Sequence, residues 1–246
     1  MKNGIKIAAI VLGITLILFL VLGVLIYAKF RAETGKMAVL ETGEIVEGIY
    51  AVKDGFVNFF LIKGQDGFIA VDAGNDAEHV GRELEKLNID SEQVRAVFLT
   101  HTDSDHTAAL GLFRWARVYI SKAEEQMING KTPRFLGLIY NKLPVKYDTL
   151  DDGQVIEVAG VKVLGILTPG HTPGSMCYVV NRHFLFTGDA MSLKDGKAML
   201  FNEFFNMDSN AQKKDLHRLK NVPDVKFIFT AHYGKTDHPK EAFENW

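Results

Sequence analysis

The sequence contains one cysteine, Cys177, among its 246 residues. A lone thiol excludes an internal disulfide and any cluster of thiolates, so a metal site in this chain must be built from histidine and carboxylate. An excess of positive charge is also lacking, because 28 basic residues face 30 acidic ones. Without residues 1–30 the remainder has 25 basic and 30 acidic residues, which argues against nucleic acid as a partner.

One long apolar run is present near the N-terminus, where residues 7–28 carry no charge. At a rise of about 1.5 Å per residue, a helix of this length spans the hydrocarbon core of a bilayer. The following "YAKFRAE" has no convincing small-residue cleavage site, so we expect an uncleaved, single-pass membrane anchor over residues 1–30. Basic residues flank both ends of the run, so the positive-inside rule barely favours one orientation in the membrane over the other. We expect the rest of the chain on the extracytoplasmic side, because a long downstream domain can be exported regardless of such charges.

Beyond the anchor, residues 31–44 mix charge with glycine and indicate a linker, and residues 45–246 are expected to form one domain. Short β-rich runs and amphipathic helical stretches alternate in this part, which is typical of an α/β fold. The runs expected to form strands include "EIVEGIYAV", "FVNFFLIK", "GFIAVDAG", "VRAVFLT", "GQVIEVAGVKVLGIL", "SMCYVVNRHFLF" and "VKFIFTAH". The stretches expected to form helices are "DAEHVGRELEKLNI", "HTAALGLFRWA", "SKAEEQMI" and "NAQKKDLHRLKN".

The loop "HTDSDH" follows the apolar run "VRAVFLT" and contains four residues of the metal-ligand type. His101, Asp103 and Asp105 alternate along the loop, and His106 follows at the expected start of a helix. Their side chains therefore divide into two sets that point to neighbouring places, and two metal ions could be held there. One loop cannot complete either coordination shell, so further ligands must come from elsewhere in the chain.

Three other histidines and carboxylates also stand directly after β-rich runs, namely His171 in "TPGHTPGS", Asp189 in "LFTGDA" and His232 in "IFTAHYG". Taken singly, such a histidine is more often a hydrogen-bonded loop residue than a ligand, and Asp189 could be an ordinary turn aspartate. The joint pattern favours ligands, because ligand sites of open α/β sheets lie at the carboxyl ends of the strands.

These motifs, in the order "VDAG", "THTDSDH", "TPGHTPGS", "FTGD" and "TAHYG", strongly resemble those of the metallo-β-lactamase-fold hydrolases. The resemblance runs from about residue 45 to residue 234. It implies a four-layer αβ/βα sandwich with the metals at the sheet edge between the two halves, so that residues 45–246 would be the catalytic domain. Asp72 of "VDAG" would support the ligand loop without binding metal.

The chain departs from the family's usual H-x-H-x-D-H loop at Asp103, which stands where a second histidine is typical. By transfer from the resemblance, the first metal site would consist of His101, Asp103 and His171. The second would consist of Asp105, His106 and His232, with Asp189 bridging the two. A site with a carboxylate favours iron or manganese more than the usual site of three histidines does. Zinc is the commonest metal of the family.

The resemblance implies a membrane-anchored, metal-dependent hydrolase with two divalent ions that share a bridging hydroxide, and with Asp105 orienting the nucleophile or relaying a proton. The scissile group would be an ester, thioester, lactone, lactam or phosphodiester. Two alternatives stay open at this point. Diiron flavoproteins of the same fold carry a carboxylate at the position of Asp103, although no flavin-binding domain follows in this chain. The other alternative is a decayed site that serves as a sensor or binding module.

We expect a small, partly apolar substrate. The segments "KTPRFLGLIYNKLP" and "MLFNEFFNMD" are rich in aromatic and aliphatic residues and flank the metal motifs in sequence. Packing in the core is the alternative for about half of these residues. The side chains expected to wall the cleft or to meet the membrane surface are Phe135, Leu138, Ile139, Tyr140, Phe201, Phe204 and Phe205.

Overall fold

The computed structural model describes residues 2–134, 137 and 139–246, which form two units, Met1–Met37 and Ala38–Trp246. The first unit contains a single long helix, α1 (Lys2–Thr34). Its segment Ile10–Thr34 is long and apolar enough to cross a membrane, a test that a signal sequence near an N-terminus would also pass. The helix continues into the residues for which the sequence predicted a linker.

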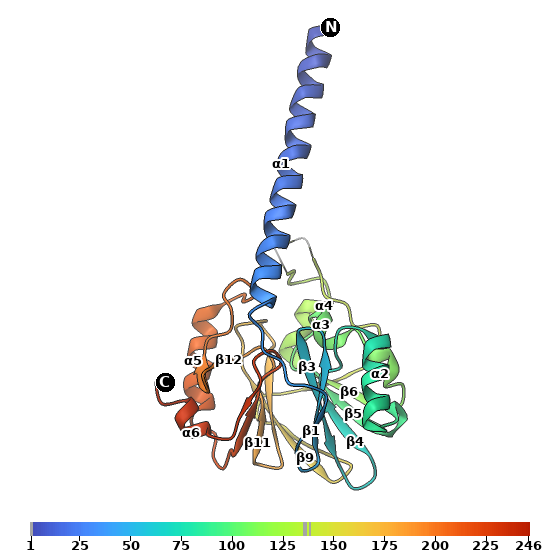
Figure 1. The fold of residues 1–246 in the computed structure, drawn as a ribbon, viewed down its shortest axis with the longest axis vertical. Coiled ribbons are helices and arrows are strands. Elements are labelled where there is room, and N and C mark those ends of the chain that lie inside the picture. Colours follow the sequence, from blue (N-terminus) through green and yellow to red (C-terminus); the bar gives the residue numbers. More distant parts are fainter. Residues whose placement is uncertain (1, 135–136, 138) are drawn as a thin grey trace. The chain divides into compact units, whose positions relative to one another are not determined.

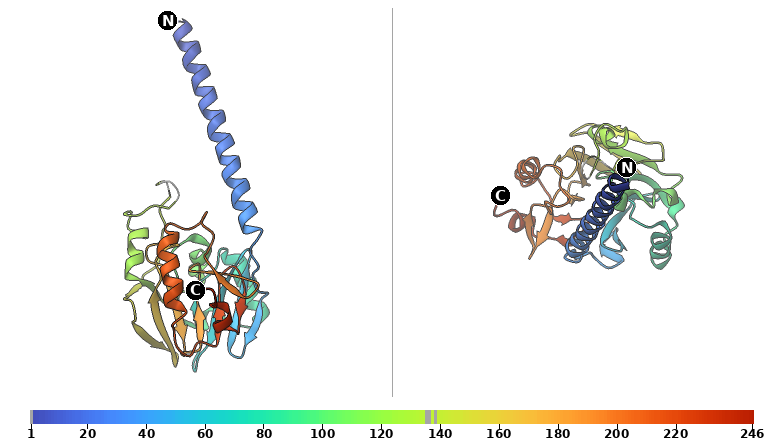
Figure 2. Two further views of the ribbon diagram at one scale, coloured as in Figure 1. Left: turned by 90° about the vertical axis from the view of Figure 1, so that its left-hand side faces the viewer. Right: turned by 90° about the horizontal axis from the view of Figure 1, so that it is seen from above.

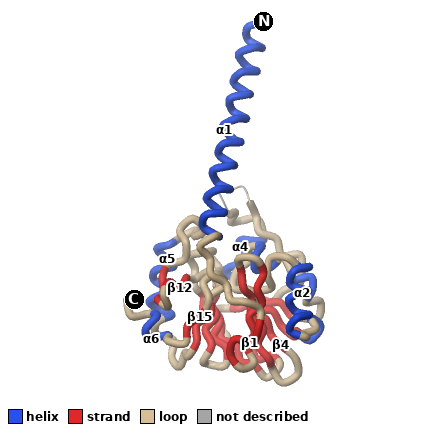
Figure 3. The backbone as a smooth tube through the Cα atoms, viewed as in Figure 1, coloured by secondary structure: helices blue, strands red, loops and turns tan. Residues whose placement is uncertain are grey.

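The second unit contains two large sheets of mixed direction (Figures 1 and 3). The first sheet pairs its seven strands in chain order, with antiparallel pairing up to β4 and parallel pairing after it. Its strands are β1 (Gly43–Val46), β2 (Ile49–Asp54), β3 (Val57–Lys63), β4 (Phe68–Val71), β5 (Val94–Phe98), β6 (Arg117–Ser121) and β7 (Asp148–Leu150).

The second sheet has the order β15-β14-β11-β10-β9-β8, and only its β11·β14 pair is parallel. Its strands are β8 (Val155–Val158), β9 (Val161–Leu167), β10 (Met176–Val180), β11 (Phe184–Phe186), β14 (Phe227–Phe229) and β15 (Lys235–Thr236). A separate two-stranded sheet is formed by β12 (Ser192–Lys194) and β13 (Lys197–Met199).

Helices cover the outer face of each large sheet. In Figure 1 and in the right-hand view of Figure 2, α2 lies on one outer side of the paired sheets, and α5 lies on the opposite side. The α-helices of this unit are α2 (Ala77–Leu87), α3 (Ser104–Thr107), α4 (Glu125–Ile128), α5 (Ser209–Leu219) and α6 (Pro239–Ala242). The part of the chain that the structure describes also has three short 3-10 turns: η1 (Ser91–Gln93), η2 (Leu110–Leu112) and η3 (Lys122–Glu124).

The burial pattern of β3 shows why the layers form. Phe60 and Ile62 point into the core between the two sheets, whereas Phe59 and Leu61 point into the core beneath α2. A strand that is covered on both faces must be apolar at consecutive positions, which accounts for the run "FVNFFLIK". A third core joins the second sheet to α5 and α6. The result is the four-layer αβ/βα sandwich that the resemblance implied.

The short helices and strands were predicted less well from the sequence. The stretch "HTAALGLFRWA" was expected to start a longer helix, but the structure has only the four-residue α3 and then the turn η2. Strands β7, β12, β13 and β15 contain two or three residues each, too few to show a period of alternation. The run "SMCYVVNRHFLF" forms the hairpin of β10 and β11, and Asn181 and Arg182 in its turn both have the positive φ that a tight hairpin turn requires.

Candidate metal centre

All seven expected ligands lie on loops that follow the carboxyl ends of strands, and the structure brings them together. Four stand on the β5–α3 loop and on α3 itself, and the others follow β9, β11 and β14. Gly188, directly before Asp189, allows this convergence because it has a φ of +51° and lies against Thr100. A Cβ atom at this glycine would come within 2.4 Å of the Thr100 hydroxyl oxygen. Only glycine therefore fits this turn.

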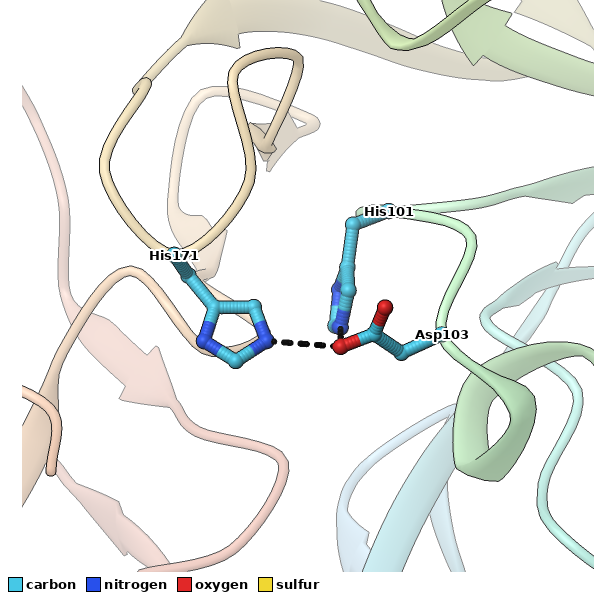
Figure 4. Close-up of side chains that lie close together, drawn as sticks. All are labelled: His101, Asp103 and His171. Atoms are coloured by element: carbon cyan, nitrogen blue, oxygen red, sulfur yellow. Dashed lines mark hydrogen bonds and ion pairs between the residues drawn. The ribbon is translucent and has the colours of Figure 1, made fainter. Parts of the chain in front are cut away.

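The first set of ligands faces inward from two loops (Figure 4). His101 Nε2 lies 3.6 Å and His171 Nε2 lies 3.1 Å from Oδ2 of Asp103. Asp103 occupies the N-cap position of α3 but makes no capping hydrogen bond there. Its carboxylate is turned toward the histidines, as expected of a ligand and not of a helix cap.

The second set lies beside the first. His106 Nε2 is 3.7 Å and His232 Nε2 is 3.5 Å from Oδ2 of Asp105. The same two nitrogens lie 3.5 Å and 3.1 Å from Oδ1 of Asp189. A tetrahedral shell with ligands at about 2.1 Å separates neighbouring donor atoms by about 3.4 Å. These four side chains therefore fit the corners of a shell around one divalent cation.

Asp189 presents one oxygen to each set. While Oδ1 faces His106 and His232, Oδ2 lies 3.4 Å from His171 Nε2. A carboxylate shared in this way allows one side chain to bridge two cations. The spacing of the donor atoms thus fits the bridging position that the resemblance implied for Asp189.

The second ring nitrogen of each histidine has a partner that fixes the orientation of the ring. His106 Nδ1 lies 2.9 Å from Asp72 Oδ2, and His232 Nδ1 lies 2.6 Å from the carbonyl oxygen of Phe56. His101 Nδ1 lies 3.1 Å from the Thr100 hydroxyl, which itself donates to Asp72. Nδ1–H donation in these contacts leaves each Nε2 lone pair available for a metal.

Among the described residues, three buried atoms of this centre have no hydrogen-bond partner: His101 Nε2, His106 Nε2 and Asp189 Oδ1. Buried polar atoms are nearly always paired, because an unpaired one loses its hydration without compensation. The three atoms belong to both ligand sets and face one another. The residues present therefore fit a divalent cation.

The electrostatics of the centre also favour bound positive charge. Burial lowers the pKa of His106, but the carboxylates of Asp72, Asp105 and Asp189 outweigh it and raise that pKa to about 10. Burial opposes ionisation of Asp189, yet His232, His171 and His106 hold its pKa well below the usual value. A group of carboxylates that stabilises positive charge on a buried imidazole provides the negative potential that attracts a metal cation.

Glu124, which joins the two ligand loops, could not be predicted from the sequence. This fully buried carboxylate accepts hydrogen bonds from the backbone and hydroxyl of Thr102, at 2.8 Å and 2.7 Å, and from the Thr172 hydroxyl at 2.6 Å. Burial raises the pKa of Glu124, although His101 and these donors oppose the shift. Thr102 and Thr172 each adjoin a ligand histidine, so Glu124 holds the two sides of the first site in register.

Replacing Glu124 by leucine is expected to leave three buried donors unsatisfied and to destabilise the fold by about 3 kcal/mol. In this size range that corresponds to a fall in Tm of about 10 °C. Differential scanning fluorimetry of the full chain in detergent would measure it. Glu124→Gln, which keeps an acceptor for Thr102, should lose less than half as much, and the exposed Glu92→Leu almost nothing. Equal Tm values for the leucine variant and the parent would show that Glu124 does not hold the two ligand loops together.

Two further residues that the sequence did not suggest contact Asp103. Arg134 Nη2 lies 2.5 Å from Asp103 Oδ2, and Asn141 donates a hydrogen bond of 2.8 Å to Asp103 Oδ1. Burial would raise the pKa of Asp103, but His101, His171 and Arg134 hold it well below its usual value. The extra negative charge that Asp103 brings to the first site is therefore offset by a guanidinium of the same chain.

The aromatic segments only partly match the expected cleft wall. Phe201 is buried, and its ring packs edge-on to His171 at 5.1 Å and lies 5.7 Å from His232, so it supports two ligand rings. Phe205 is buried as well and Phe204 half-buried, whereas Ile139 and Tyr140 are exposed. Phe135 and Leu138 lie outside the described residues.

The profile of the metallo-beta-lactamase superfamily matches residues 52–232 of this chain. A protein of Bacillus velezensis named "Probable polyketide biosynthesis zinc-dependent hydrolase BaeB" is 32% identical over 126 residues, which cover 50% of this chain and 49% of that protein. A hydroxyacylglutathione hydrolase of Aeromonas hydrophila subsp. hydrophila is 32% identical over 188 residues, which cover 74% and 62%. The chain thus spans about half to two thirds of the length of these curated relatives.

Solved structures show the same similarity. A metallo-beta-lactamase from Cronobacter sakazakii, a mutant in its HARLDQ motif, superposes with a TM-score of 0.62 at 25% identity, and the match covers 79% of this chain and 81% of that one. The superfamily profile covers most of the second unit, including all the ligand loops described above. The chain is a member of the metallo-beta-lactamase superfamily.

Proposed function

We propose that this protein is a metal-dependent hydrolase that uses two divalent ions held by the two ligand sets. One observation carries the proposal: two imidazoles and two carboxylates meet at the tetrahedral spacing of about 3.4 Å and leave buried donor atoms unpaired. Zinc is the first candidate, because one relative is named a zinc-dependent hydrolase. Iron and manganese are the next, because carboxylates form a large part of the ligand set.

When bound, such ions supply a nucleophilic water of lowered pKa and a Lewis acid for the scissile carbonyl or phosphoryl group. The residues of the chain position the reactants. Among the carboxylates of the second set, Asp105 has a side chain that is 20% exposed, whereas that of Asp189 is 5% exposed. Asp105 can therefore reach an incoming water and accept its proton, while Asp189 stays fixed between the two sets.

We infer that the substrate is a small molecule with an ester, thioester, lactone, lactam or phosphodiester bond. A thioester comes first, because one relative is named for hydrolysis of an acylglutathione. A partly apolar acyl group is favoured by Ile139 and Tyr140, which are exposed and adjoin the residues that bind Asp103. These two side chains are available to an aliphatic or aromatic chain that approaches from solvent.

A hydrolysis panel tests this proposal. The full chain in detergent would be stripped with a chelator, reloaded with zinc or manganese, and assayed on one acyl thioester, one ester, one lactone, one lactam and one phosphodiester. We expect turnover of at least one acyl substrate that disappears on stripping and returns on reloading. No hydrolysis by a metal-loaded sample, together with oxygen consumption in the presence of a reduced flavoprotein, would favour the diiron oxidoreductase chemistry instead.

We further propose that α1 anchors the protein in a membrane, with the second unit on the extracytoplasmic side. The full chain should then sediment with membranes and resist extraction by alkaline carbonate. A chain that begins at Met37 should be soluble and bind the same number of metal equivalents, because all proposed ligands lie in the second unit. A full chain released by carbonate, or a truncated chain without metal, would refute this division of roles.

A further inference from the structure

Arg134 reaches the first ligand set from the segment between α4 and β7. Its backbone pairs with that of Ile139 through hydrogen bonds of 2.6 Å and 3.3 Å, and its side chain is almost fully buried. Nη1 donates to the carbonyl oxygen of His171 at 3.1 Å. Nη2 lies 2.5 Å from Asp103 Oδ2 and 3.2 Å from His171 Nε2. The guanidinium therefore touches two of the three donor atoms of the first site.

A metal and the guanidinium would compete for His171. A neutral imidazole has one lone pair on its acceptor nitrogen, which can bind a metal or accept one hydrogen bond, but not both. Nδ1 of this ring lies 3.4 Å from the side-chain oxygen of Asn206, which is an acceptor, so Nδ1 carries the proton. The lone pair is then on Nε2, the nitrogen that faces the site. A cation bound by His171 therefore requires Nη2 of Arg134 to leave that nitrogen.

A metal and the guanidinium would also compete for Asp103. Its Oδ1 accepts the hydrogen bond from Asn141, which fixes the carboxylate and turns Oδ2 toward the histidines. The oxygen that faces the site is thus the one that Arg134 holds. The guanidinium is a cation, so it also repels an incoming dication.

We propose that Arg134 is an internal cation of the first site, which occupies the place of a metal until it is displaced. The two sites then fill in sequence: the second site first, with Asp105, His106, His232 and Asp189, and the first site only after Arg134 has left His171 Nε2. His101 Nε2 has no hydrogen-bond partner among the described residues, so the first site keeps one free donor for the arriving ion. This inference rests on the metal sites of the proposed function. It specifies the order in which the two sites fill and their unequal affinity for metal.

Zinc titration of the full chain in detergent, against a competing fluorescent chelator, tests the proposal. We expect two binding steps in the parent. Arg134→Met keeps the approximate length of the side chain and removes its charge and donors. It should raise the zinc affinity of the second binding step, which fills the first site, about tenfold or more. The affinity of the first binding step should not change. Arg117→Met, which removes an exposed arginine paired with Asp148, serves as the control and should change neither step.

An Arg134→Met variant with an unaltered second step would overturn the inference, and so would a zinc-loaded crystal structure in which Arg134 Nη2 still contacts His171 Nε2. If this variant does not fold because Asp103 loses the guanidinium beside it, the double variant Asp103→Asn with Arg134→Met removes both charges. Its second step must then be tighter than that of Asp103→Asn alone; equal affinities would also overturn the inference. No zinc binding in either step by the folded parent would instead refute the proposed function.

Discussion

Asp105→Asn is expected to remove one metal equivalent and to lower kcat about a thousandfold or more. Asparagine keeps the shape of the side chain but removes the negative charge that faces His106 and His232. It also removes the proton acceptor that is most exposed among the carboxylates of the second set. His232→Ala should have the same two effects, because it deletes one corner of the tetrahedral set.

Elemental analysis and turnover on the best substrate of the panel would measure both effects. The matched controls are Asp66→Asn and His238→Ala, which change exposed residues of the same types outside the centre. They should keep full metal content and activity. If Asp105→Asn held as much metal as the parent and hydrolysed substrate at a similar rate, the second ligand set would not be the catalytic one.

Asp103→His is the second change for which we expect a large effect. From sequence alone it would recreate the usual three-histidine site and favour zinc. The structure leads to a different expectation, because the buried guanidinium of Arg134 would then lose the carboxylate of Asp103 and lie against an imidazole instead. Breaking a buried ion pair in this way costs about 3–5 kcal/mol. We therefore expect Asp103→His to lower Tm by about 10 °C and to leave the first site empty of metal.

The double variant Asp103→His with Arg134→Met should reverse both effects, because it removes the buried guanidinium, which is also the competitor for His171. Tm and the number of zinc equivalents would be compared for the parent, both single variants and the double variant. The two substitutions should be strongly non-additive, as expected for side chains in direct contact. Additive changes, or a stable two-zinc protein from Asp103→His alone, would show that Arg134 does not compensate the charge of Asp103.

The strand ends, and the polar side chains that the structure brings together beside them, could be predicted from the sequence for a physical reason. A ligand loop follows an apolar run that has to be buried, so the run marks both the strand and the end at which the loop emerges. His101, His171 and His232 could be placed in this way before their contacts were known. The core strand β3 was equally clear, because burial on both faces requires consecutive apolar residues.

Glu124, Arg134 and Asn141 could not be predicted in this way. Each bonds to a residue more than twenty positions away, and none stands in a periodic pattern. Their partners depend on how the segment between β6 and β7 folds over the ligand loops, which is a matter of tertiary packing. The consequence is largest at Asp103, where the sequence indicated an added negative charge and the structure shows an ion pair.

Anomalous X-ray diffraction from crystals grown with zinc, recorded on both sides of the zinc absorption edge, tests the central claim most directly. We predict a strong peak about 2.0–2.2 Å from His106 Nε2 and His232 Nε2 and from one oxygen each of Asp105 and Asp189. At higher zinc concentration a second peak should appear among His101, Asp103 and His171. Crystals that show no anomalous peak within coordination distance of these seven residues would contradict the assignment of a metal centre to this chain.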